Sequence, residues 1–334
     1  MNLDNLYKTL ANQPKYRVQQ VKEAIFGKLI ADWSEASNLP KELKETLNKE
    51  CPLEIKGKFF SSEETEASKA LITLSDGLQI ETVLLAHKDG RFTVCVSTQV
   101  GCPLGCKFCA TGKMGLLRNL EYGEMIDQVL FFSRYLKDEN TRVSNVVFMG
   151  MGEPFLNYDN VIKAIKYLNE DLKIGARKIS ISTSGVIPGI KRLADEDLQL
   201  NLAISLHAPN DKLRSELMPI NKGFPLTKLL PAVDAYIRKT GRQVMFEYLL
   251  IRGVNDQPQH AAELAELMKK PLYIVNLISY NPTDAFKASR SIDVRKFKEI
   301  LERQGIVVTQ RYSFGQDINA ACGQLATKSK KAKN

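Results

Sequence analysis

Hydrophobic and polar positions in the first fifty residues follow the period of an α-helix. Over 16–30, apolar side chains recur every three or four positions, which places them on one helix face. A shorter helical pattern covers 39–47. We therefore expect a small helical module at the N-terminus.

Residues 67–99 change to short runs typical of β-strands. The runs are interrupted at Asp76-Gly77 and at Asp89-Gly90, dipeptides that favour tight turns and hairpins. The segment is therefore predicted to form three successive strands.

Beyond residue 115, predicted helices alternate with predicted strands. Helices are expected near 120–137, 159–169, 188–195, 226–239, 258–269 and 292–304. Strands are expected at 145–150, 178–183, 201–206, 243–250, 272–278 and 306–310. Such alternation requires parallel strands joined by helical crossovers. With the strand before Cys102 it makes about six βα units, which predicts an α/β fold with a partial (βα)6 TIM-like barrel. A doubly wound sheet is the alternative.

These changes divide the chain into four predicted parts. Residues 1–50 form an N-terminal helical accessory module, and residues 51–90 form a strand-rich connector. Residues 91–315 form the partial barrel, and residues 316–334 form a C-terminal loop with a short, lysine-rich tail.

The composition is that of an ordinary globular protein, with 44% apolar and 25% charged residues among 334. No apolar run approaches the length of a membrane span, and the first residues lack the apolar core of a signal peptide. We therefore expect a cytoplasmic protein without a membrane partner, and nothing indicates that it is other than a monomer. A net charge of +9 favours a polyanionic partner, although charge alone does not decide this.

Three of the six cysteines lie close together in GCPLGCKFC (101–109). Cys102, Cys106 and Cys109 are separated by three and then two residues, with no histidine between them. A structural zinc takes four ligands, whereas three thiolates can hold a cubane 4Fe-4S cluster that keeps one iron free of protein ligands. In a cytosolic chain this group favours metal or redox chemistry over a disulfide scaffold.

Polar or glycine-rich clusters follow several of the predicted strands. They are GMGEP (150–154), STSG (182–185), SLH (205–207) and SYNP (279–282). The carboxyl ends of parallel strands meet on one face of the fold, where ligands bind. Glycines there let the backbone approach a ligand, and Glu153 could accept a hydrogen bond from an ammonium group. We therefore expect a cofactor pocket on this rim.

Six motifs together resemble the RlmN/Cfr family of radical S-adenosylmethionine (SAM) adenosine methyltransferases, and most closely its RlmN branch. They are CVSTQVGCPLGCKFCATGKMG (95–115), FMGMGEPFLN (148–157), ISTSG (181–185), SLHAPND (205–211), LMPIN (217–221) and DINAACGQL (317–325). The resemblance runs nearly end to end. It implies one 4Fe-4S cluster and SAM as cofactors, and methylation of carbon 2 of an adenosine. The implied substrates are 23S rRNA at the peptidyl transferase centre and a transfer RNA beside its anticodon, with an electron donor such as flavodoxin or ferredoxin.

The resemblance implies a role for each residue of this chain that matches a functional position of the family. The implied cluster ligands are Cys102, Cys106 and Cys109. The implied SAM contacts are Gly152, Glu153, Ser184, Ser205, Leu206, His207 and Asn281. Cys322 matches the cysteine that is methylated, Cys95 matches its resolving partner, and Glu81 matches a carboxylate assigned to proton handling.

Three of these residues have simpler interpretations without the resemblance. Cys95 would be a buried strand residue, His207 a hydrogen-bonded residue at a strand end, and Glu81 a solvent-facing strand residue. The superfamily motif also has two adjacent glycines before its glutamate. Here Met151 separates Gly150 from Gly152, which leaves the role of Gly150 open.

The implied reaction needs two thiols because carbon 2 of adenine is electron-poor and does not attack the methyl group of SAM. Cys322 takes a methyl group from one SAM, and a second SAM supplies a 5′-deoxyadenosyl radical that removes hydrogen from that methyl. The resulting carbon radical adds to the ring. Cys95 then attacks the Cys322 sulfur and forms a transient disulfide.

Three alternatives remain open. A Cfr-type enzyme would methylate carbon 8 of the same adenosine, and SFGQD (313–317) departs from the pattern commoner in the RlmN branch. A methylthiotransferase would need further cysteines for a second cluster, and only Cys51 has no assigned role. A noncatalytic RNA-binding protein with a structural metal would also suit the charge and the three cysteines.

Overall fold

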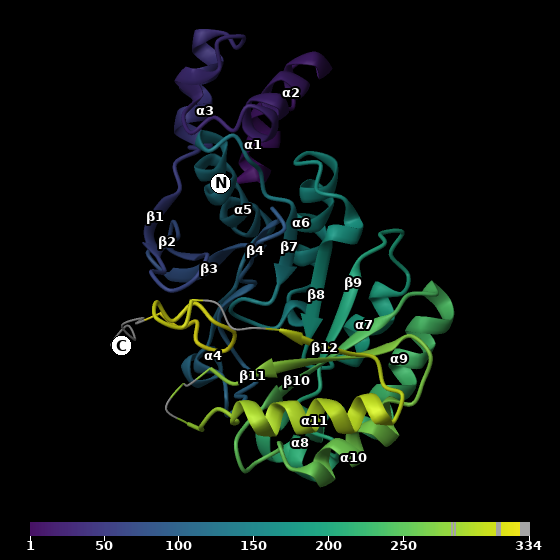
Figure 1. Ribbon diagram of the computed structural model, residues 1–334. Coiled ribbons are helices and arrows are strands. Elements are labelled where there is room, and N and C mark those ends of the chain that lie inside the picture. Colours follow the sequence, from purple (N-terminus) through teal and green to yellow (C-terminus); the bar gives the residue numbers. More distant parts are fainter. Residues whose placement is uncertain (282, 284, 312–314, 328–334) are drawn as a thin grey trace, which may run out of the picture.

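A ten-stranded mixed sheet organises the computed structural model of the chain (Figure 1). The structure describes residues 1–281, 283, 285–311 and 315–327. The strand order is β1-β2-β3-β4-β7-β8-β9-β10-β11-β12, and β5 and β6 form a separate two-stranded sheet.

The carboxyl-terminal seven strands of the large sheet run parallel. They are β4 (Phe92–Cys95), β7 (Asn145–Phe148), β8 (Ile179–Thr183), β9 (Asn201–Ser205), β10 (Val244–Leu250), β11 (Tyr273–Ser279) and β12 (Val308–Arg311). The connecting helices are α5 (Tyr122–Asp138), α6 (Tyr158–Glu170), α7 (Ile187–Leu193), α8 (Asp211–Leu217), α9 (Leu226–Thr240), α10 (Pro258–Met268) and α11 (Ser291–Arg303).

These strands lie side by side in chain order, which is the winding of a barrel and not of a doubly wound sheet. Among the described residues, β12 pairs only with β11, so the barrel is open. Six βα units followed by β12 confirm the predicted α/β class and the partial (βα)6 barrel. The short helix α8 was not predicted.

Burial on both faces explains the apolar sequences of the central strands. In β10, VMFEYLL, every position except Met245 is buried. Strands covered on both sides lose the alternation of apolar and polar residues and become nearly continuous apolar runs. Glu247 is the one charged residue in this strand, and it lies in the interior of the fold.

Three antiparallel strands extend the sheet beyond β4. They are β1 (Lys56–Ser61), β2 (Ala67–Thr73) and β3 (Gln79–Ala86). Gly77 and Gly90 have φ of +81° and +82°, the left-handed conformation that the two predicted turns require. The three predicted strands correspond to β2, β3 and β4. The edge strand β1 was missed because it is largely exposed and carries no clear apolar pattern.

The N-terminal helices are α1 (Leu3–Leu10), α2 (Lys15–Lys22) and α3 (Lys41–Glu50). The predicted helix over 16–30 is wrong beyond Gly27. The chain passes from α2 into a single π-helical turn, and Leu29 then has φ of +57°, which no α-helix accommodates. The helix α1 was not predicted.

One buried apolar cluster extends from Leu3 in the N-terminal helices to Leu325 near the C-terminus. A smaller cluster includes Cys106 and Phe108 of the three-cysteine loop, together with Met218. Because apolar contacts continue across residues 50 and 90, the division into four parts stays a prediction. The lysine-rich tail falls mainly on 328–334, outside the described residues.

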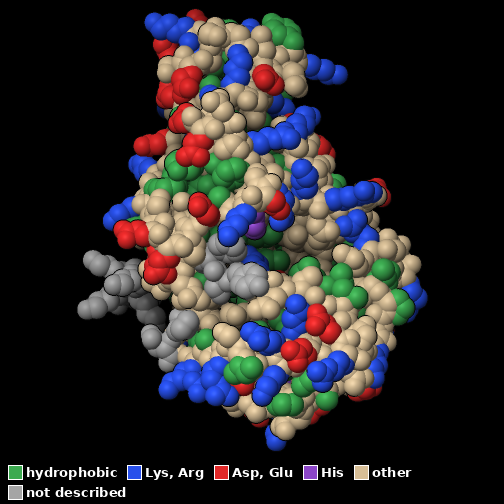
Figure 2. All heavy atoms as spheres, viewed as in Figure 1, with side chains coloured by type: hydrophobic (Ala, Val, Ile, Leu, Met, Phe, Trp, Pro, Cys, Tyr) green, Lys and Arg blue, Asp and Glu red, His purple; other side chains and the backbone are tan. Residues whose placement is uncertain are grey.

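Basic side chains are spread over the face seen in Figure 2, from the N-terminal helices to the opposite end, with acidic side chains between them. On this face the basic side chains are thus spread out and not gathered into a single patch. Within the described residues, no helix combines the length and the apolar character needed to cross a membrane.

Candidate active site

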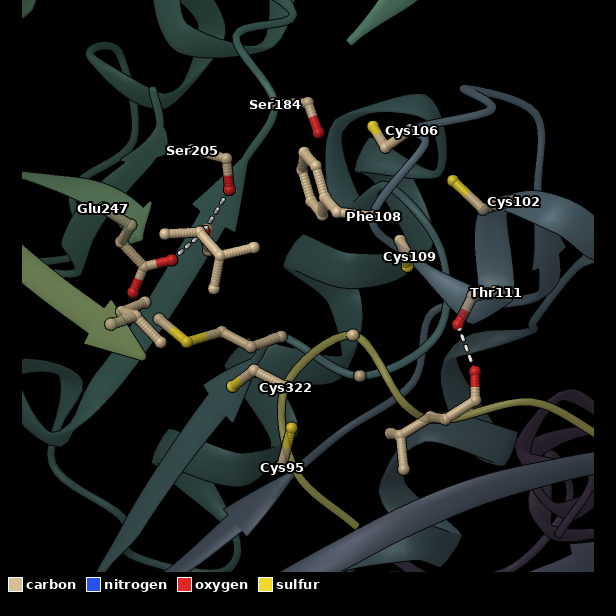
Figure 3. Close-up of a pocket in the computed structure, with 18 of the residues that line it drawn as sticks. Cys95, Cys102, Cys106, Phe108, Cys109, Thr111, Ser184, Ser205, Glu247 and Cys322 are labelled. Atoms are coloured by element: carbon tan, nitrogen blue, oxygen red, sulfur yellow. Dashed lines mark hydrogen bonds between the residues drawn. The ribbon is translucent and has the colours of Figure 1, made fainter. Parts of the chain in front are cut away.

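The three-cysteine loop connects β5 (Gln99–Cys102) to α4 (Ala110–Met114) and lines one side of a deep pocket (Figure 3). The hairpin of β5 with β6 (Gly115–Asn119) holds the base of this loop. At Gly101, with φ of +82°, a Cβ atom would lie 1.9 Å from the carbonyl oxygen of Gly115. Only glycine therefore lets the two strands approach in this way.

Two of the three thiols, those of Cys102 and Cys106, are buried, and that of Cys109 is partly exposed. Burial raises the pKa of Cys102 to about 12 and raises the pKa of Cys106 further, and Cys109 adds to both shifts. All three are free. Among the described residues, no three His, Cys, Asp or Glu side chains converge as the ligands of a single ion would. A cubane cluster instead takes each thiolate on a different iron, so this donor set suits such a cluster.

Two further thiols reach the same pocket from distant parts of the chain. Cys95 ends β4, and Cys322 lies on the C-terminal segment 315–327. Figure 3 shows them beside each other, away from Cys102 and Cys106. Burial, and then the neighbouring Cys322, raise the pKa of Cys95 to about 12. Both thiols are free, so the structure contains no disulfide between them.

Hydrogen bonds hold the C-terminal segment across the pocket. Thr111 Oγ1 donates to the carbonyl oxygen of Leu325 at 2.5 Å (Figure 3). Asn281 Nδ2 donates to the carbonyl oxygen of Cys322 at 3.1 Å, and Gln316 Nε2 donates to Asn281 Oδ1 at 2.7 Å. The segment that carries Cys322 is therefore fixed to α4, which follows the three-cysteine loop, and to the residues that follow β11.

Glu81 is not among the side chains that line this pocket. It forms a buried ion pair with Lys69, with 2.9 Å between Oε1 and Nζ. Its Oε2 accepts a hydrogen bond from the Ala326 amide at 2.9 Å, and Lys69 donates to the carbonyl oxygen of Asn319 at 3.4 Å. The pair thus anchors the C-terminal segment on both sides of Cys322. The solvent-facing interpretation of Glu81 is wrong, and its role in proton handling stays a prediction.

The carboxylate of Glu153 is enclosed by donors from its own chain. It accepts hydrogen bonds from Thr183 Oγ1 at 2.7 Å, from the Ser184 amide at 2.8 Å and from the Phe155 amide at 3.1 Å. Burial raises its pKa, and these hydrogen bonds oppose that shift by stabilising the ionised form. Glu153 therefore ties the loop after β7 to the loop after β8, while it still faces the pocket.

The structure gives Gly150 a packing role. A Cβ atom there would lie 2.7 Å from Ser97 Oγ and 2.8 Å from the Ser97 amide nitrogen. Gly152 has φ of +102°, and its Cβ atom would meet the side chain of Gln99 at 2.6 Å. Both glycines thus let the loop after β7 lie against the segment that leads into β5.

Six of the seven implied SAM contacts line the pocket: Gly152, Glu153, Ser184, Ser205, His207 and Asn281. The side chain of Leu206 does not, because it is buried in the main apolar core. The ligand-facing set therefore comes from the ends of several strands, as expected for a parallel fold.

His207 is a neutral, hydrogen-bonded residue. Its Nδ1 accepts from the Leu249 amide at 3.1 Å, which places the ring proton on Nε2. Its ring meets that of Phe108 edge to face, with 4.9 Å between the centroids. Burial and then the charge of Arg214 lower its pKa to about 3. The residue therefore cannot act as a cation near neutral pH.

Sequence reasoning missed Arg214, whose side chain is fully buried. Its guanidinium donates to the carbonyl oxygens of Ser184, Ser205 and Leu206 and to Asn221 Oδ1, at 2.6 to 3.2 Å. It thereby joins two of the loops that line the pocket. No pattern in the sequence marks Arg214, because its partners are mainly backbone carbonyls.

Sequence reasoning also missed Glu247 and Arg311, which line the pocket near Cys322. A charge inside the apolar run of β10 was an available signal for Glu247. Arg311 ends β12, and Cys322, Glu247 and Cys95 raise its pKa in that order of strength. Its guanidinium therefore lies among one carboxyl group and two thiols.

An open parallel barrel with a three-cysteine loop after its first strand defines the class of radical SAM enzymes. A family model for the radical SAM superfamily matches residues 96–265. A crystal structure of a radical SAM methyltransferase from Sphaerobacter thermophilus superposes with a TM-score of 0.93, at 44% identity over 97% of each chain. The protein is therefore a radical SAM methyltransferase that uses a 4Fe-4S cluster and SAM.

Similar curated proteins indicate which family of radical SAM methyltransferases this is. A probable dual-specificity RNA methyltransferase RlmN of Dictyoglomus thermophilum is 48% identical, over 94% of this chain and 91% of that protein. The protein of the same name from Geobacillus thermodenitrificans is 46% identical, over 99% and 93%. The chain belongs to the RlmN family. The methylthiotransferase and noncatalytic alternatives are therefore wrong.

Proposed function

We propose that this enzyme methylates carbon 2 of an adenosine in 23S rRNA, at the peptidyl transferase centre, and of an adenosine beside the anticodon of transfer RNA. The observation that carries the proposal is that Cys322 and Cys95 line the same pocket as the three-cysteine loop. The relatives named dual-specificity RNA methyltransferase support RNA as the substrate. The proposed setting is the cytoplasm, with a monomeric enzyme and a one-electron donor such as flavodoxin or ferredoxin.

The pocket suits the cofactors that the family uses. Cys102, Cys106 and Cys109 would hold the cluster, and the residues on the rim, with Glu153 and Asn281 among them, would hold SAM. When bound, the cluster and SAM supply a methyl group and a 5′-deoxyadenosyl radical. The protein's own residues must then direct both to one sulfur atom.

Cys322 is that sulfur. Its thiolate attacks the methyl carbon of a first SAM, the bond from that carbon to the sulfonium sulfur breaks, and S-adenosylhomocysteine leaves. Removal of one hydrogen atom from the S-methyl group leaves a carbon radical that can add to the electron-poor carbon 2. Loss of the ring proton, and of one electron that would return by way of the cluster to the external one-electron carrier, restores the aromatic ring, which is then joined to Cys322 through a methylene.

Cys95 releases the RNA. Its thiolate attacks the Cys322 sulfur, the carbon–sulfur bond breaks, and the methylene takes the electron pair and a proton to become methyl. The product is a Cys95–Cys322 disulfide, which two electrons from the external donor reduce before the next cycle. The high pKa of Cys95, raised by burial and by Cys322, keeps it protonated until the adduct forms. Glu81 is the proposed carboxylate for proton handling, acting once the C-terminal segment moves.

RNA must present its target base to this pocket. Unstacking and extruding an adenosine costs a few kcal/mol unless the RNA already exposes it. The distributed positive charge can offset that cost through phosphate contacts, with the N-terminal helices as one contact surface. Affinity for RNA should therefore fall steeply as salt concentration rises.

Mass spectrometry of nuclease-digested 23S rRNA tests the proposal. RNA from cells with the protein should contain 2-methyladenosine, and RNA from cells without it should not. The Cys322→Ala variant should behave as the deletion does. Cys51→Ala should behave as wild type, because Cys51 does not line the pocket and instead donates to the Asn2 carbonyl oxygen beside the N-terminal helices. Detection of 8-methyladenosine alone would establish the Cfr-type alternative instead.

A further inference from the structure

The carboxyl group of Glu247 has an unmet hydrogen-bonding requirement inside the active-site pocket. Its side chain is buried, with the residue 6% exposed, and it lines the pocket. Ser182 Oγ donates to Oε2 at 3.2 Å. Oε1 is buried and has no partner among the described residues. Buried acceptors are almost always satisfied, so a ligand that brings a donor to Oε1 would complete this site.

The position of Glu247 limits which ligand this can be. Figure 3 shows it on the opposite side of the pocket from Cys102 and Cys106, where the cluster would be held. Glu247 and Cys322 both raise the pKa of Arg311, the last residue of β12. The open acceptor therefore lies in the part of the pocket that also holds the Cys322 sulfur, away from Cys102 and Cys106.

We propose that Glu247 Oε1 accepts a hydrogen bond from the exocyclic amine of the target adenine and so selects adenosine. The inference rests on the proposed function. Adenine presents two N–H donors at carbon 6, whereas guanine and inosine present an acceptor oxygen there. A carboxylate facing that oxygen would leave two buried acceptors in contact, which discriminates against 6-oxo purines.

The chemistry of adenine also agrees with this placement. Carbon 6, which bears the amine, and carbon 2 flank the same ring nitrogen, whereas carbon 8 lies in the other ring. If Glu247 holds the amine, carbon 2 lies one ring position beyond the nitrogen next to carbon 6. Cys322 and Glu247 both influence Arg311, so the Cys322 sulfur lies in the same part of the pocket. Glu247 is thus a specificity-determining residue for carbon 2 chemistry.

A ribose hydroxyl of SAM is the competing donor, because Glu247 pairs in register with Ser205, an implied SAM contact. The two sources are separable. Methylation of Cys322 by SAM needs no RNA, so a carboxyl group that serves SAM would change the SAM dependence of that first step. A carboxyl group that serves adenine would leave it unchanged.

The experiment compares wild type with Glu247→Gln, both with the cluster reconstituted anaerobically, on 23S rRNA fragments that carry adenosine or inosine at the target position. Wild type should methylate the inosine substrate roughly 10- to 100-fold more slowly, the effect of one charged hydrogen bond. The glutamine amide can donate to the 6-oxygen, so Glu247→Gln should reduce this preference about tenfold or more. Because each preference is a ratio within one preparation, partial misfolding cancels.

An unchanged preference in Glu247→Gln would overturn the inference. A raised SAM requirement for RNA-free methylation of Cys322, read as the added mass of one methyl group, would also overturn it by assigning the carboxyl group to SAM. The adenosine substrate with wild type tests the proposed function separately. No methyladenosine there would refute the proposed function and the inference with it, whereas methyladenosine without discrimination would refute the inference alone.

Discussion

The two ends of the active-site pocket are built in different ways. At one end, Cys102, Cys106 and Cys109 come from a single loop of eight positions, closed by the β5–β6 hairpin. At the other end, β4 and the C-terminal segment supply Cys95 and Cys322, which lie 227 positions apart in the chain. The first end is a local motif, whereas the second exists only when the whole barrel is folded. Substitutions at the two ends should therefore disable different steps of the reaction.

The largest effect is expected at the local end. Cys106→Ala removes one of three thiolates that would hold the cluster, so reductive cleavage of SAM and RNA methylation should both fall to background. Iron content after anaerobic reconstitution, with 5′-deoxyadenosine as the second readout, checks this. Full iron content with normal SAM cleavage in Cys106→Ala would show that this loop does not hold the cluster. Cys51→Ala is the matched control.

At the distal end, Cys95→Ala should separate steps that Cys106→Ala abolishes together. SAM cleavage should continue, but RNA should accumulate as a covalent adduct on Cys322 because no thiol attacks its sulfur. A denaturing gel would show the slower-migrating adduct, and Cys95→Ala combined with Cys322→Ala should lose it. Free methylated RNA from Cys95→Ala, at the wild-type rate, would contradict the resolving role.

The ion pair that anchors the distal end gives a third comparison. Glu81→Gln leaves the buried Lys69 charge unpaired and should cost about 3 kcal/mol in the free energy of unfolding. Glu81→Gln with Lys69→Met removes both charges and should recover most of that loss. Urea unfolding measures both variants. The double variant also tests the role of Glu81, because a purely structural residue would allow methylation to recover, whereas a proton-handling carboxylate would not.

The smallest effect concerns pH and involves His207, whose ring contacts Phe108 of the three-cysteine loop. Burial lowers its folded pKa to about 3, below the ordinary value of 6.5, so the unfolded chain binds the extra proton more readily. The contribution to stability is complete above pH 6.5 and is lost as the pH falls towards 3. Between pH 6.5 and pH 5 the loss should be about 1.6 kcal/mol, since the slope approaches about 1.4 kcal/mol for each pH unit only well below pH 6.5. His207→Gln should remove this part of the pH dependence in urea unfolding. An equal slope in both proteins would show that other groups cause it.

Much of the architecture was readable from the sequence. The alternation of helices and strands gave the βα units because each element needs the hydrophobic period of its own geometry to bury a face. The turns at Gly77 and Gly90 were readable because few other residues accept positive φ. The helix over 16–30 was predicted too long, since the apolar spacing continues past the π-helical turn at Glu23–Gly27, where the backbone no longer follows it.

Some residues of the candidate site could likewise be predicted from the sequence, and others could not. The three-cysteine loop and the glycines beside it could be found without a structure, because their function depends on spacing within one segment. Only the tertiary structure placed Arg214, Glu247 and Arg311 at the pocket and set Glu81 in an ion pair with Lys69. Their roles depend on which distant carbonyls, thiols and charges surround them, and a barrel brings those groups together only when its strands associate. Periodicity records which face of an element is buried, but not which group from another element it meets there.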